Sequence, residues 1–272
     1  MINRFFTSLF IVLLFSFSAK AQSSPALIND PDGFTYIRSG KGTHFESIGK
    51  IEKDEFFYCD STFMDWWKVY VLKLDKQYHY NQLEGYVHKS RVQLLKDLSD
   101  TSQKSLINNT LSVFKKQVEI RLAFWNKYHQ NKNKWKTSAD SIASNKESEK
   151  CQFYSDSKYD PILNIIPQYF CKTKDTLMLQ LFLATMWVDN GSANESPSYA
   201  IGLCFECQPE LVIGLISKFK SKSKRDFFYD DIEFGLGDAL DVDENGYSSN
   251  KEYPKLKKKL DNARKYKSAQ QK

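Results

Sequence analysis

The sequence is poor in the side chains that many hydrolases use as bases or metal ligands. Its 272 residues include only four histidines, at positions 44, 79, 88 and 129. Four of the five cysteines come after position 129, whereas a thiol nucleophile needs an imidazole base beside it. No two histidines have the helix-turn spacing of a zinc hydrolase. This composition predicts a protein that is not an enzyme.

Cysteine is too sparse to build the fold by itself, and its odd number leaves at least one thiol unpaired. Cys204 and Cys207 lie three residues apart in a segment that is expected to be helical. Their Cβ atoms would then be about 5–6 Å apart, whereas a relaxed disulfide needs about 3.8 Å. We expect two buried free thiols, because a bridge between them needs the helix to end there. The other cysteines are Cys59, Cys151 and Cys171.

The sequence has one long apolar run, and it lies at the start. Arg4 is followed by apolar residues from Phe5 to Phe17 and then by Ala19-Lys20-Ala21. This order is typical of a secretory signal peptide, residues 1–21, cut before Gln22. The run is shorter than the about 20 residues of a spanning helix. The prediction is an exported protein, periplasmic or extracellular, with no integral membrane segment after cleavage.

The stretch "YIRSGKGTHFESIG", residues 36–49, resembles a phosphate-binding loop at first sight. A dinucleotide fingerprint needs glycine three residues after Gly42, but Phe45 is there. A Walker loop needs Ser or Thr after the lysine, but Gly42 follows Lys41. The glycines are therefore interpreted as turn residues that permit positive φ between β-strands.

Residues 27–96 alternate between apolar and polar side chains, which is typical of short β-strands. In "WWKVYVL", Trp67 and the two valines face one side. The predicted inward set is Ile37, Trp67, Val69 and Val71, and the predicted outward set is Tyr36, Arg38, Trp66, Lys68 and Tyr70. Outward aromatic rings beside cations form a candidate patch for binding sugar or peptide. The alternative is that they pack against the helical domain or cover the edge of the barrel itself.

Three quoted segments, "NDPDGFTYIRSGKGTHFESIGKI", "DWWKV" and "EGYVHKSRV", resemble a bacterial SH3-like (SH3b) domain over residues 26–96. The resemblance implies a small, strongly bent β-barrel that is not catalytic. It also implies binding of a cell-wall glycan or peptide, or of an envelope protein. The predicted strand faces give Tyr36, Arg38, Trp66 and Tyr70 as the candidate binding residues. Eukaryotic relatives grip polyproline with a proline and a tyrosine in the closing strand. Those places hold His88 and Arg91 here, so polyproline is not the expected ligand.

From about residue 101 the apolar period becomes helical. A stripe at positions 106, 107, 111, 114, 118, 122 and 125 predicts one long helix, and the apolar segment 176–188 predicts the centre of a second core. Residues 131–150 are polar and are predicted to be a flexible segment. The fold prediction is therefore α+β and multidomain, with a small SH3-like β-barrel followed by an all-α helical domain at 101–267.

Two features of the C-terminal part carry charge. Residues 251–272 hold nine basic residues against two acidic ones. The preferred interpretation is a solvated helix face, with contact to anionic lipid or wall polymer as the alternative and no nucleic-acid partner. The segment "DVDENGYSSNKE", residues 241–252, has oxygen ligands at the spacing of an EF-hand-like calcium loop. Pro254 and two nearby glycines, Gly235 and Gly237, argue against that loop, and the alternative is an acidic turn.

These patterns predict an exported, non-catalytic binding protein of the bacterial envelope with no cofactor. A calcium-binding protein using 241–252 is the first alternative. A cell-wall hydrolase with an unrecognised helical catalytic domain is the second.

Overall fold

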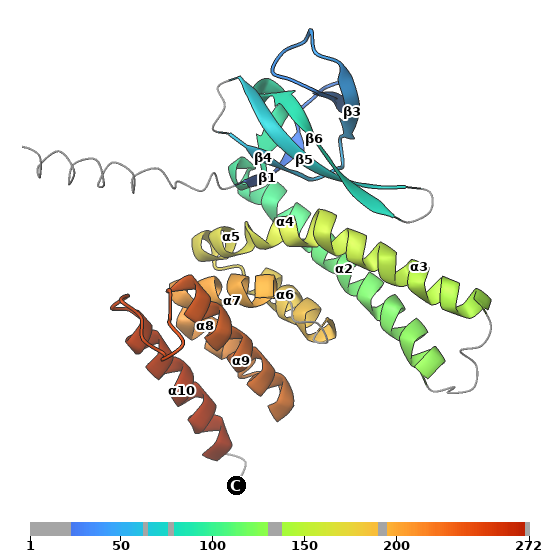
Figure 1. Cartoon of the computed structure of the whole chain (residues 1–272). Coiled ribbons are helices and arrows are strands. Elements are labelled where there is room, and N and C mark those ends of the chain that lie inside the picture. The colour runs from blue at the N-terminus through green and yellow to red at the C-terminus, as the bar shows by residue number, and fades with distance from the viewer. Residues whose placement is uncertain (1–22, 62–64, 76–78, 130–137, 190–194, 270–272) are drawn as a thin grey trace, which may run out of the picture.

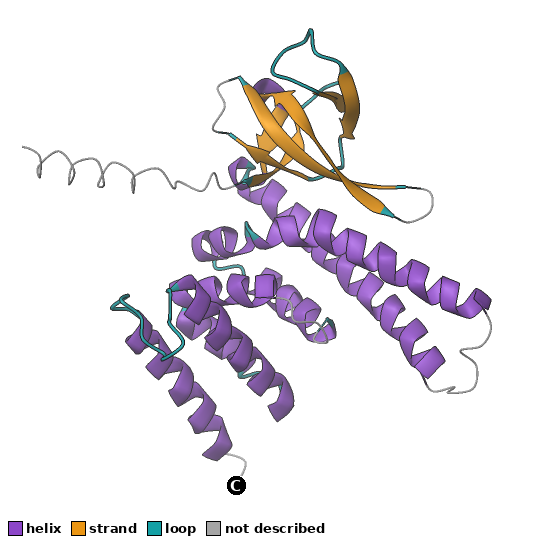
Figure 2. Cartoon of the chain, viewed as in Figure 1, coloured by secondary structure: helices purple, strands orange, loops and turns teal. Residues whose placement is uncertain are grey.

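The computed structural model describes residues 23–61, 65–75, 79–129, 138–189 and 195–269. The predicted signal peptide, 1–21, lies outside these residues. The chain is α+β: a curled antiparallel sheet comes first and a group of helices follows (Figure 1). Figure 2 shows the strands gathered on one side of the molecule and the helices on the other.

The sheet has seven strands in the order β3-β2-β6-β5-β4-β1-β7. β1 starts at Ser24, earlier than the pattern predicts, and pairs with both β4 and β7. The first strand therefore joins the middle of the sheet to its edge. The strands are β1 Ser24–Ile28, β2 Phe34–Arg38, β3 Ser47–Glu52, β4 Phe57–Asp60, β5 Trp66–Leu74, β6 Tyr80–His88 and β7 Val92–Leu94.

The predicted strand faces are confirmed. Ile37, Val69 and Val71 are fully buried inside the curled sheet, and Trp67 packs against the same cluster. Tyr36, by contrast, is 49% exposed. Alternation along the strands thus separates an apolar interior from an outer face, as a half-buried antiparallel sheet requires.

The glycine-rich stretch forms a turn between β2 and β3, closed by a hydrogen bond of 2.9 Å from Ser39 N to Glu46 O. Gly42 has a positive φ of 159°, as predicted, whereas Gly40 and Gly49 do not, which corrects the predicted reason for these two. A Cβ on Gly40 would lie 2.6 Å from the Phe45 ring, and one on Gly49 would lie 2.4 Å from Leu83. At both positions the close approach of a side chain favours glycine.

The helical part forms its own core beneath the sheet (Figure 1). α6 lies within this core, as its sequence predicts, with Phe182 and Leu183 fully buried, although Leu177 is 70% exposed. The helices are α2 Asp100–His129, α3 Ser138–Tyr154, α4 Asp160–Leu163, α5 Ile166–Thr173, α6 Thr176–Val188, α7 Glu195–Cys207, α8 Pro209–Ile216, α9 Lys222–Ala239 and α10 Tyr253–Ala269. Short 3-10 turns η1 Lys89–Arg91 and η2 Leu95–Asp97 flank β7, and the π-helical turn η3 Ser155–Tyr159 joins α3 to α4.

The predicted flexible segment 131–150 is wrong from Ser138 onward, because α3 occupies Ser138–Tyr154. Its polar sequence has a weak apolar stripe. The helix is anchored at its end, where Cys151 is buried and the Tyr154 ring stacks with Phe114 of α2 at 6.4 Å. Tertiary packing against α2 thus overrides a weak local preference.

The sheet and the helices share apolar contacts. Phe56 and Leu95, which flank strands of the sheet, are buried in the helical core and not in the sheet's own core. The amide of Gln103 on α2 donates to the carbonyls of Leu95, Lys96 and Leu98 at 3.3, 2.9 and 3.2 Å. This side chain therefore fixes the link between the last strand and the first long helix.

The basic C-terminal segment forms a helix, α10, that packs on α9 with one side and carries its cations on the rest. Leu256 and Leu260 are buried against the core. Its cations pair with acidic residues of neighbouring helices: Lys257 and Arg264 with Glu233, both at 2.8 Å, and Lys259 with Glu210 at 2.9 Å. Much of the positive charge is therefore balanced within the protein.

Within the described residues, no single helix is long and apolar enough to cross a membrane. α7 and α8 satisfy length and composition only as a pair bent by 120°. Their buried faces belong to the helical core.

Candidate functional site

The predicted site residues of β2 lie together on the outer side of the sheet. The Arg38 guanidinium is 5.5 Å from the centre of the Tyr36 ring, within the range of a cation–π contact. Arg38 also donates to the carbonyl of Phe45 at 3.2 Å, which holds the guanidinium beside the turn. The Tyr36 ring has an edge-to-face contact with Phe34 at 5.3 Å. The exposed Tyr36 ring therefore contacts Arg38 and Phe34, which hold it in place.

The predicted residues of β5, Trp66 and Tyr70, are half-buried. Trp66 contacts the His88 ring edge-to-face at 5.4 Å between centroids. The Lys68 ammonium lies 4.9 Å from the centre of the Tyr70 ring and 3.0 Å from the Glu84 carboxylate. Aromatic and charged side chains therefore alternate along the outward side of this strand.

β6 connects the two groups, although its residues were not among the predicted binding residues. Tyr86 is directly opposite Arg38 on β2 and Lys68 on β5, so the three side chains form a row across the sheet. The alternation of "EGYVH" gives the signal, because Glu84, Tyr86 and His88 share one parity. We call these eight residues the outer face: Tyr36, Arg38, Trp66, Lys68, Tyr70, Glu84, Tyr86 and His88.

The outer face is interrupted at β4, where the helices begin to cover the sheet. Tyr58 is directly opposite Tyr70 and therefore lies on the same side. Its hydroxyl interacts with Asn164, and burial, followed by the nearby charge of Asp160, raises the pKa of Tyr58 to about 12. Tyr58 therefore packs against the helices, whereas Tyr36 on β2 is exposed and Arg38 is half-buried.

Tyr58 forms part of a cleft between the sheet and the helices, which we call the junction cleft. Its volume is about 590 Å³, within the usual range for small-molecule sites. β1 and β4 line one side, and α4, α7 and the end of α9 line the other. The polar lining includes Tyr58, Lys96, Asp160, Asn164, Gln168, Glu195 and Asp238.

Asp160 is the most perturbed carboxylate of this cleft. Its Oδ1 atom is buried and has no hydrogen-bond partner among the described residues. Burial, followed by the negative charges of Asp156 and Asp189, raises the pKa of Asp160 to about 6. It directly follows the π-helical turn η3, a feature that often marks functional positions.

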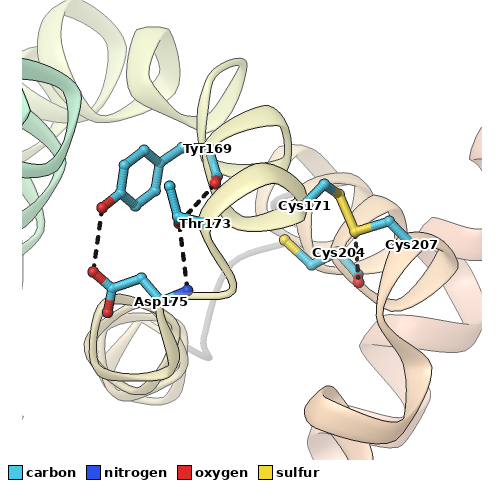
Figure 3. The surroundings of a disulfide bond; sticks show 6 residues. All are labelled: Tyr169, Cys171, Thr173, Asp175, Cys204 and Cys207. Carbon is cyan, nitrogen blue, oxygen red and sulfur yellow. Dashed lines mark hydrogen bonds between the residues drawn. A yellow bond between two sulfur atoms is a disulfide. The ribbon is translucent and has the colours of Figure 1, made fainter. Parts of the chain in front are cut away.

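Cys207 is not a free thiol, which corrects the prediction for the "CFEC" pair. It forms a disulfide with Cys171, with Cα atoms 5.8 Å apart, whereas Cys204 is a buried free thiol. α7 ends at Cys207, so this side chain turns toward α5. Figure 3 shows the disulfide on one side of α5 and the hydrogen bonds among Tyr169, Thr173 and Asp175 on the other.

The three free thiols, Cys59, Cys151 and Cys204, are all buried. Burial raises the pKa of Cys59 to about 12 and also raises the pKa values of Cys151 and Cys204. A thiol needs its thiolate form to act as a nucleophile. These environments therefore favour structural roles.

The predicted calcium loop is a compact turn with Gly246 at φ 77°. The Asp243 carboxylate accepts from the backbone N–H groups of Asn245 and Tyr247 at 3.0 and 2.8 Å. Glu252 points to Lys255, 2.8 Å away. Within the described residues, no three His, Cys, Asp or Glu side chains gather closely enough to hold a metal ion. The loop thus forms a hydrogen-bonded turn, and calcium binding by it stays a prediction.

Comparison of the chain with protein-family models, with curated proteins and with solved structures gives no match.

Proposed function

We propose that the chain is an exported, non-catalytic binding protein of the bacterial envelope, and that its sheet is an SH3-like domain. Its ligand is a cell-wall glycan or peptide, or an envelope protein. The observation that carries the proposal is the outer face: Tyr36 is half-exposed beside Arg38, and Tyr86 links this pair across the sheet to Lys68 on β5. Aromatic rings next to charged and hydrogen-bonding groups suit sugars and peptides.

The SH3-like assignment is supported by the curled sheet and by the turn that follows Arg38. Export is supported by the signal-peptide pattern and by the disulfide between Cys171 and Cys207, because disulfides persist in oxidising compartments. The raised pKa values of the buried thiols argue against one class of enzyme, that with a cysteine nucleophile.

A sedimentation assay on purified peptidoglycan tests the proposal. We expect the mature protein to co-sediment, and we expect Trp66→Ala to weaken binding at least tenfold, which corresponds to about 1.4 kcal/mol. Trp125→Ala is the matched control, because this tryptophan is 50% exposed but lies on α2, away from the outer face. Equal binding by wild type and Trp66→Ala would count against the outer face. No binding to peptidoglycan would leave envelope proteins as the ligand class, tested by crosslinking from position 36.

A further inference from the structure

The junction cleft has the chemistry of a second binding site, independent of the outer face. It lies between the sheet and the helices, and its lining is mixed rather than only acidic. The aromatic rings of Tyr58 and Tyr199 and the side chains of Leu163 and Leu203 give it apolar walls. Asn164 and Gln168 add amide groups. A concave apolar space with a few polar groups is the usual form of a small-molecule site.

The electrostatic environment of the cleft is negative. Three carboxylates, Asp160, Glu195 and Asp238, line it, against one ammonium group, Lys96, among the described lining residues. The negative charge of Asp189, whose carboxylate pairs with Arg121 at 2.8 Å, adds to this environment of Asp160. Among the described residues, no ion pair joins Asp160 to a cation.

The Oδ1 atom of Asp160 carries the argument furthest. It is buried and accepts no hydrogen bond from any described residue, although a buried carboxylate oxygen normally has a donor. Asp160 is also a lining residue of the cleft, so a donor that enters the cleft meets this residue, and rotation of its side chain about the Cα–Cβ and Cβ–Cγ bonds would bring the unpartnered oxygen to that donor. The chemistry that fits is a positively charged hydrogen-bond donor.

A primary ammonium group fits better than a metal ion. Among the described residues no three candidate metal ligands come together, so a metal ion would lack a coordination shell. An ammonium group is a compact charge with three donors. The Asp160 carboxylate, the Tyr58 hydroxyl and the amide oxygens of Asn164 and Gln168 offer acceptors within one cleft. Tyr199, which is 41% exposed, offers a ring to the attached carbon chain.

We propose that the junction cleft binds a primary amine, with Asp160 as the counter-ion and the aromatic and aliphatic walls holding the carbon chain.

The test is an NMR titration of the mature protein with Nα-acetyl-lysine amide. The comparison ligand is Nα-acetyl-norleucine amide, which has the same chain without the ammonium group. We expect the lysine derivative to shift amide signals around residues 58, 160 and 199, and the neutral analogue to bind at least tenfold more weakly. Asp160→Asn keeps the size of the side chain and should weaken binding of the lysine derivative at least tenfold.

Two further variants keep the test decisive. Glu195→Gln removes an exposed carboxylate at the rim and should weaken binding about threefold without a risk to folding. Asp32→Asn removes an exposed carboxylate that does not line the cleft, and it should leave binding unchanged. Equal binding of the two ligands, or equal weakening by Asp32→Asn and Asp160→Asn, would overturn the proposal. Because the outer face takes no part, these results stand whether or not the protein binds peptidoglycan.

Discussion

Two glycines hold helices α7 and α9 in close contact. A Cβ on Gly235 would lie 1.7 Å from the carbonyl oxygen of Ser198, and one on Gly202 would lie 2.4 Å from the backbone of Gly235. Backbone atoms cannot move aside as a flexible side chain can. These residues are therefore glycine because the helices touch at that point.

Gly235→Ala should destabilise the protein by about 1–3 kcal/mol or more, because the new methyl group forces the two helices apart. Gly214→Ala is the matched control, since Gly214 also lies in a helix but has open space around its missing Cβ. The control should be neutral or gain up to about 1 kcal/mol from helix propensity. Urea unfolding of both variants measures this. Equal stability of the two variants would contradict the close crossing.

Two buried carboxylates should make the protein more stable in mild acid. Burial raises the pKa values of Asp160 and Asp231 to about 6, against about 3.9 in an unfolded chain. Between these values the folded state binds more protons, so stability falls as pH rises from about 4 to about 6 and stays lower above that. The pKa of Asp175 is shifted in the opposite direction. Burial raises this pKa, but Lys104 and backbone N–H groups lower it by more. The stability that the Asp175 carboxylate contributes is lost only as the pH falls through this lowered pKa.

Asp160→Asn should therefore raise the free energy of unfolding at pH 7.5 by on the order of 2 kcal/mol and leave it nearly unchanged at pH 4. Thermal melts of wild type and variant across this range give the comparison. A gain that is equal at both pH values would show that Asp160 is not the titrating group.

At the residue scale, the sequence predicts the strand faces well, because alternation depends on burial alone. It does not predict Asp160, since its burial follows from where the sheet meets α4. The same holds for Tyr58. It shares one side of the sheet with Tyr70, but the helices cover Tyr58 and leave Tyr70 on the outer face. A residue in a junction takes its properties from two elements that are far apart in sequence.

At the scale of elements, the disulfide ties α5 to the end of α7 across 36 residues. Cysteine pairing cannot be deduced from spacing alone. The expectation of two free thiols rested on the distance between Cys204 and Cys207 in a regular helix. Cys207 is not paired with Cys204, but it forms its disulfide with Cys171 on another helix.

Loss of this disulfide should destabilise the protein by about 3–4 kcal/mol, from the loop-closure entropy of a loop of this length. Cys171→Ser and a reducing agent should have similar effects, and the reducing agent should add little to the variant. In the denatured, unreduced protein a thiol reagent should titrate three groups, and after reduction five. Five groups without reduction would contradict the bond.

Helix prediction succeeds where the apolar stripe meets the core and fails where it does not. Ile107, Leu111, Phe114 and Val118 are buried, but Trp125 is half-exposed because the end of α2 extends past the core (Figure 1). The neighbouring α3 lacks a clear stripe and is held by packing at one end. The apolar pattern of α2 therefore matches the burial of its side chains in the middle of the helix and not at its end.

At the scale of the whole molecule, the sheet and the helices should unfold together. Leu95 is fully buried in the helical core although it directly follows β7, and Gln103 bonds to the backbone around it. Opening the sheet would expose this leucine and break those hydrogen bonds. The two cores are therefore energetically linked, although each has its own set of side chains.

Leu95→Ala should cost about 2–5 kcal/mol and should lower the protection of both parts by the same amount. Hydrogen exchange measured in β5 and in α6 reports on the two cores separately. The matched control is Leu122→Ala, which truncates a leucine at the exposed end of α2 and should change neither. If Leu95→Ala increases exchange in α6 but leaves β5 protected, the sheet folds on its own and the link through Leu95 is only local.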